Sequence, residues 1–86
     1  MATKTRRAPR QSANSPAWID AGNASTLQRC TLVDVSEYGA RLAGRGVELV
    51  PDKFTLLLSK AGHPRHRCNV IWKLNNEIGV EFIPGQ

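Results

Sequence analysis

The chain has 86 residues, of which 41% are hydrophobic, and its net charge is +5. This length allows one small domain, and no run approaches the ~18 apolar residues of a membrane-spanning helix. The first ten residues carry four of the twelve basic residues and no acidic one, so the rest of the chain is almost neutral. This distribution disfavours a protein that coats duplex nucleic acid with a basic face.

The basic N-terminus is not followed by an apolar segment, so we expect no secretory signal. Cys30 and Cys68 each stand within a strand-like run. Cysteines in such positions are typical of buried thiols in a reducing compartment. We therefore predict a cytoplasmic protein that does not associate with a membrane.

Residues 1–15 are polar and basic, and they predict a flexible N-terminal arm. No later segment has a convincing helical period, and short apolar runs alternate with turn residues. Asn75 and Asn76 predict a tight hairpin turn. We expect strands at 16–21, 27–36, 40–43, 54–59, 67–73 and 77–83. This pattern favours an all-β domain over residues 16–84, a closed six-stranded antiparallel barrel with little or no helix.

Alternation along these strands predicts which side chains fill the barrel. If Val33 and Val35 face the interior, Asp34 and Ser36 stand side by side on the exterior. The turn at Gly39 follows at once and would let a ligand approach the backbone. We expect a core made of Val33, Val35, Leu42, Phe54, Leu56, Leu58, Val70, Trp72, Ile78, Val80 and Phe82.

The arm and the second strand offer complementary chemistry. Arg6 and Arg10 stand four residues apart, and arginine presents a fork of donors to phosphate or to a guanine edge. Asp34 is an acceptor suited to the N–H donors of guanine, and Ser36 can donate or accept. A cationic arm with a fixed acceptor pair fits a guanine nucleotide that carries phosphates.

The segments RRAPR and DVSEYG resemble the paired RxxxR and (D/N)xSxxG motifs of the PilZ domain family. The ending CNVIWKLNNEIGVEF is similar to the last two strands of that family, so the resemblance extends over about residues 5–83. It implies a PilZ-type barrel that binds cyclic di-GMP without catalysis, needs no cofactor and signals to an effector protein. Thr5 stands where some members carry another arginine, which leaves open whether one ligand or a stacked pair binds. The ligand-binding residues that the resemblance implies are Arg6, Arg7, Arg10, Asp34, Ser36 and Gly39.

Other interpretations stay open. A small basic barrel can bind single-stranded nucleic acid on exposed aromatic rings, although Tyr38 is the only aromatic residue that we expect at the surface. A degenerate PilZ domain could serve only as a protein-interaction module. His63, His66 and Cys68 include zinc-type ligands, but their spacing matches no common zinc site. No grouping of nucleophile, base and acid suggests an enzyme, and we expect no catalytic residue and no metal.

Overall fold

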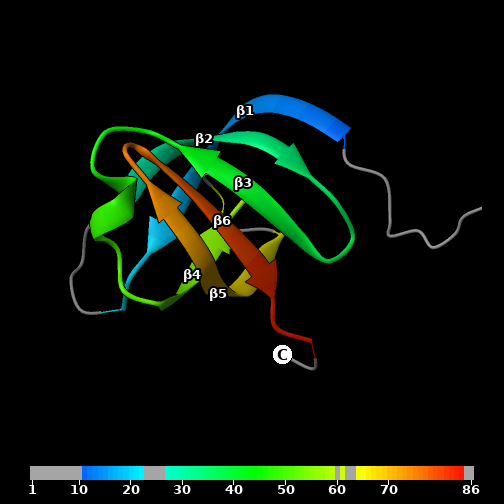
Figure 1. The fold of residues 1–86 in the computed structure, drawn as a ribbon. Helices are drawn as coiled ribbons and strands as arrows, with labels where there is room; N and C mark the ends of the chain where they lie inside the picture. Colours follow the sequence, from blue (N-terminus) through cyan, green and yellow to red (C-terminus); the bar gives the residue numbers. More distant parts are fainter. Residues whose placement is uncertain (1–10, 23–26, 60, 62–63, 85–86) are drawn as a thin grey trace, which may run out of the picture.

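The computed structural model describes residues 11–22, 27–59, 61 and 64–84. Within these ranges the chain forms six strands and one short 3-10 turn (Figure 1). Their bounds are β1 Gln11–Asp20, β2 Gln28–Val35, β3 Gly39–Ala43, η1 Val47–Leu49, β4 Lys53–Leu57, β5 Arg65–Leu74 and β6 Glu77–Phe82. None of the helical segments in the described part of the chain is long and apolar enough to cross a membrane.

The six strands form one closed barrel in the order β1-β2-β3-β6-β5-β4, and every neighbouring pair is antiparallel. Closure leaves no free sheet edge, which removes the unpaired backbone groups that an open sheet would present. The predicted fold class is confirmed. The first strand begins at Gln11, five residues before the expected start at Pro16. The other part of the predicted arm, residues 1–10, lies outside the described residues.

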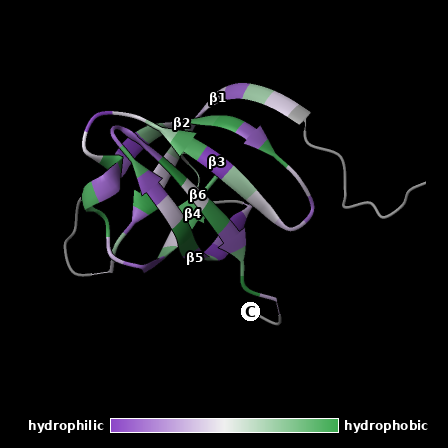
Figure 2. Ribbon diagram, viewed as in Figure 1, coloured by the Kyte–Doolittle hydropathy of each residue, from purple (hydrophilic) through white to green (hydrophobic). Residues whose placement is uncertain are grey.

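Apolar side chains from all six strands and from η1 fill the barrel, and Figure 2 shows hydrophobic positions recurring along the strands. The largest fully buried ones are Phe54, Ile19, Leu42, Leu56, Ile78, Val47 and Cys68. Four other predicted core residues, Val35, Leu58, Val70 and Phe82, are partly buried and pack against this cluster. Burial raises the pKa of the Cys30 thiol to about 11 and that of Cys68 to about 12. Both cysteines are free, as the sequence predicts.

Two predicted core residues are not in the core. Val33 is only half-buried, and the interior positions of β2 belong instead to Cys30 and Leu32. Trp72 is 38% exposed and lies on the outside of β5. Both errors have the same physical cause, which is a β-bulge that interrupts strict alternation.

Candidate functional site

A bulge in β2 turns Asp34 to the outside of the barrel. Leu32 pairs with Leu42 of β3, but Asp34 already pairs with Arg41, so Val33 is an extra residue with no partner of its own. Arg41 lies between the buried Ala40 and Leu42 and therefore points outward. Residues directly opposite each other on paired strands share a face. Asp34 thus lies on the exterior, as predicted, although for a different reason.

A second bulge does the same for Trp72. Val70 pairs with Val80 of β6, and Trp72 pairs with the next residue, Gly79, so Ile71 is the extra residue. Ile78 and Val80 are buried and point inward. A side chain at Gly79, which lies between them, would therefore point to the outside of the barrel. A β-carbon on Gly79 would overlap the Trp72 indole. The ring therefore lies directly over Gly79 on the outer surface.

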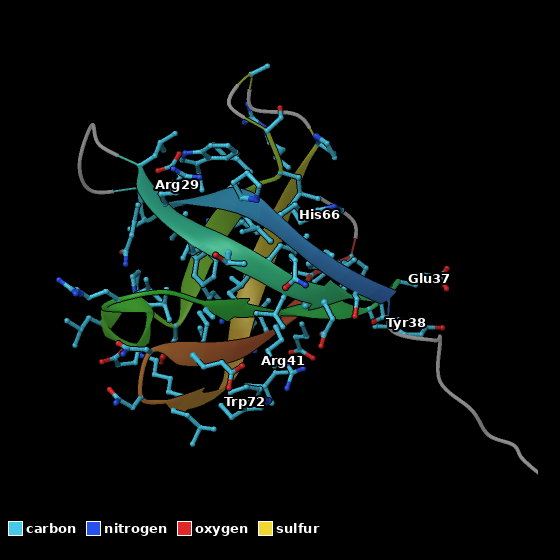
Figure 3. All side chains as sticks on the ribbon, turned by 90° about the horizontal axis from the view of Figure 1, so that it is seen from above. Arg29, Glu37, Tyr38, Arg41, His66 and Trp72 are labelled. Atoms are coloured by element: carbon cyan, nitrogen blue, oxygen red, sulfur yellow. The ribbon has the colours of Figure 1, made fainter. Side chains whose placement is uncertain are left out.

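The two bulges align four residues in a row across the outside of the barrel. Neighbouring strands pair Asp34 with Arg41, Arg41 with Gly79, and Gly79 with Trp72. We name these four residues the outer row. Figure 3 shows Arg41 and Trp72 on the same side of the barrel, and Gly79 lies between them in the row. With strands ~4.8 Å apart, the row spans about 14 Å of curved surface, with a carboxylate at one end and an aromatic ring at the other.

The carboxylate of Asp34 is buried even though it lies on the exterior face. Only 7% of the residue is exposed, and Arg41 Nη2 donates a hydrogen bond to Asp34 Oδ2 at 2.7 Å. Arg41 Nε also lies 3.7 Å from Glu77 Oε2, at the start of β6. A buried carboxylate needs such a charged partner because desolvation penalises an isolated charge. The site therefore holds a fixed anion next to a half-exposed cation.

Ser36 and Gly39 build the turn that follows Asp34. The Ser36 amide donates to the Gly39 carbonyl at 2.8 Å, and the Ser36 hydroxyl oxygen accepts a hydrogen bond from the Tyr38 amide at 3.2 Å. Gly39 is the first residue of β3, and a β-carbon there would overlap the carbonyl oxygen of Val80. Gly39 is thus needed for the close approach of β6. Its expected role of letting a ligand approach the backbone at this turn stays a prediction.

The structure brings together the three predicted site residues of the second motif, Asp34, Ser36 and Gly39, within one hairpin. The arm residues Arg6, Arg7 and Arg10 lie outside the described residues. Sequence reasoning missed Arg41 and Gly79, and it placed Trp72 in the core. A usable signal existed: counting back from the Asn75–Asn76 turn pairs Trp72 with Gly79, which places the indole outside.

Two other predicted features can be located. Tyr38 is 64% exposed at the tip of the β2–β3 turn, beside Glu37 (Figure 3). Among the zinc-type residues, Cys68 is buried in the core and His66 stacks on Phe82 with ring centroids 4.3 Å apart. His63 lies outside the described residues. No group of metal-binding side chains forms among the residues that the structure describes.

The chain is thus a small closed barrel that carries a polar and aromatic row of residues on its outer surface. The model of the PilZ domain family matches residues 4–86. The chain therefore belongs to the PilZ domain family, a family of cyclic di-GMP receptors that are in general not catalytic. A search of curated proteins finds no match to the chain.

Proposed function

We propose that this protein is a non-catalytic receptor that binds cyclic di-GMP between its arm and the outer row and then signals to an effector protein. The observation that carries the proposal is the position of Asp34, a buried carboxylate held on the exterior face of β2. Family membership supports the choice of ligand. The effector remains to be identified, and we place the protein in the cytoplasm.

Each group has a distinct role in this proposal. Asp34 accepts hydrogen bonds from the N–H groups of a guanine edge. The turn formed by Ser36 and Gly39 fixes the backbone next to Asp34. Trp72 provides a flat ring on which a second planar base can stack, and such stacking contributes about 1–3 kcal/mol per base. The phosphates are bound by Arg6, Arg7 and Arg10 of the arm.

We further propose that the arm takes a fixed position only in the complex, which is the signal that the effector recognises. Ordering a short segment costs on the order of 2–5 kcal/mol of the gross binding energy. The affinity should therefore be micromolar rather than picomolar. Deleting residues 1–10 should abolish binding and leave the thermal unfolding temperature nearly unchanged, because β1 begins at Gln11.

Calorimetric titration with cyclic di-GMP tests the proposal directly. The parent protein should bind, and Asp34→Ala should bind about ten- to a hundredfold more weakly, since a charge-assisted contact is lost. Cyclic di-AMP should bind far more weakly than cyclic di-GMP, because adenine has no donor at N1 and an amino group in place of O6. Equal affinity for the two dinucleotides would contradict base recognition by Asp34.

Binding of single-stranded nucleic acid is the second candidate. Its support is the exposed Trp72, which adds an aromatic ring to the exposed Tyr38 at the surface. The two functions differ in their dependence on salt, which is steep for a polyanion and shallower for a dinucleotide. Titration with a single-stranded oligonucleotide at two salt concentrations would distinguish them.

A further inference from the structure

Arg41 lies between two carboxylates on the outside of the barrel. It donates to Asp34 at 2.7 Å through Nη2, and its Nε faces Glu77 at 3.7 Å. The side chains of Arg41 and Glu77 are 44% and 30% exposed, so neither is held rigidly by packing. Arg41 can therefore move from Asp34 towards Glu77 without giving up an ion pair.

The bond from Arg41 uses the carboxylate that the proposed function assigns to guanine. The guanidinium group has five N–H donors and no acceptor. The guanine edge that would face Asp34 consists of N–H donors as well. The carboxylate could accept several donors, but the Asp34 side chain is only 10% exposed and Arg41 lies against it, so little of it is open to a second set of donors, and the two sets repel each other. Binding of the base at Asp34 therefore opposes the bond from Arg41.

We propose that Arg41 occupies Asp34 in the ligand-free protein and is transferred to Glu77 when the base binds, an inference that rests on the proposed function. Without ligand, Arg41 stabilises a carboxylate that is almost fully buried. With ligand, the guanine donors replace it, and Glu77 keeps Arg41 paired. Arg41 thus sets the affinity of the site, and Glu77 contributes to binding without touching the ligand.

A double-mutant cycle with cyclic di-GMP as the titrant tests this transfer. Arg41→Gln should bind about three- to tenfold more tightly than the parent, because the bond from Arg41 no longer has to be broken. Glu77→Gln should bind about threefold more weakly, because the displaced Arg41 loses its second partner. Adding Glu77→Gln to Arg41→Gln should have no further effect. A purely structural role of Glu77 would weaken binding equally in both backgrounds.

Arg29→Gln is the matched control for charge. Arg29 is exposed on β2, where it pairs with Trp18 of β1, away from the outer row. The Arg29→Gln substitution removes one positive charge, as Arg41→Gln does, and should slightly weaken binding of an anionic ligand. Thermal unfolding should show a lower midpoint for Arg41→Gln and for the double variant, but not for Arg29→Gln or Glu77→Gln. If that variant does not fold, Arg41→Lys replaces it, because lysine keeps the charge but lacks the fork that reaches both acids.

The outcomes separate the two proposals. If Arg41→Gln binds cyclic di-GMP more weakly than Arg29→Gln does, Arg41 contacts the ligand and the transfer is wrong. The transfer is also wrong if Glu77→Gln has the same effect with and without Arg41. If the parent does not bind cyclic di-GMP, or if Asp34→Ala binds as well as the parent, the proposed function fails and the transfer fails with it.

Discussion

The indole of Trp72 lies over Gly79 so closely that no side chain fits beneath it. Gly79 belongs to β6 and Trp72 to β5, and counting from the Asn75–Asn76 turn puts them in direct register, while the bulge at Ile71 lets Val70 pair with Val80. Bulges are common next to binding sites, where they redirect a side chain. Strict alternation along β5 would place the Trp72 ring in the core. Because of the bulge, the ring lies instead on the same outer surface as Asp34.

Gly79→Ala should displace the Trp72 ring without unfolding the barrel. The three atoms nearest to the new methyl group all belong to the Trp72 side chain, which can rotate away from it. We expect a loss of stability of about 1 kcal/mol and a change in Trp72 fluorescence, measured in a Trp18→Phe background. Cyclic di-GMP affinity should fall as it does for Trp72→Ala. Unchanged fluorescence would mean that the ring does not rest on Gly79.

Gly39→Ala should destabilise the protein more than Gly79→Ala. The added methyl group would meet the backbone of β6 at Val80 rather than a mobile side chain, so the pairing of β3 with β6 must shift. We expect a loss of roughly 2–4 kcal/mol in the free energy of unfolding, measured by urea denaturation. If the two variants are equally stable, the close approach of the strands at Gly39 is not the reason for the glycine.

Asp34→Ala should reduce stability as well as binding. The change removes the carboxylate that accepts from Arg41 at 2.7 Å, but Arg41 is half-exposed and keeps Glu77 nearby. The loss should therefore be small, about 0.5–1.5 kcal/mol in the free energy of unfolding. Chemical denaturation measures it, with Asp52→Ala as the control because Asp52 is an exposed acid. A fully unfolded Asp34→Ala variant would contradict this assignment.

Cys30 and Cys68 should react slowly with thiol reagents. Burial raises the pKa of Cys30 to about 11 and that of Cys68 to about 12, so little thiolate forms at neutral pH. At pH 8 the raised pKa alone should slow alkylation of Cys30 roughly a hundredfold relative to the unfolded chain. Labelling with and without denaturant, followed by mass spectrometry, measures the ratio. Rapid labelling of the folded protein would show that the core opens readily.

The same thiols make stability depend on pH in alkali. An unfolded cysteine, with a pKa of 9.0, loses its proton before the folded one does, so the unfolded state binds fewer protons above pH 9. The contribution of the buried thiols is complete below pH 9 and is lost as pH rises towards 11 and 12. The free energy of unfolding should fall over this window, and less steeply in Cys30→Ala. An equal slope in both proteins would contradict the assignment.

The barrel could be predicted from the sequence because alternating apolar residues and turn residues mark each strand. The alternation of apolar residues does not reveal the bulges, since the extra residues Val33 and Ile71 are themselves apolar, and only counting from the Asn75–Asn76 turn indicates the second bulge. The apolar pattern continues through such a residue without a visible break. A prediction from alternation therefore places Val33 and Trp72 in the core. The contact of Arg41 with Asp34 was also beyond reach, because it depends on the pairing of two strands at a bulge.

Chemical-shift mapping with cyclic di-GMP tests the central claim that the outer row is the binding surface. The chain has two tryptophans, and their indole N–H signals report on different parts of the barrel surface, because Trp18 lies on β1, where it pairs with Arg29 and Leu57, and Trp72 lies in the outer row on β5. The account predicts that the Trp72 indole signal shifts on titration, together with the amides of Asp34 and Gly79, while the Trp18 indole signal stays in place. A shift at Trp18 with no change at Trp72 would place the ligand away from the outer row and contradict the account.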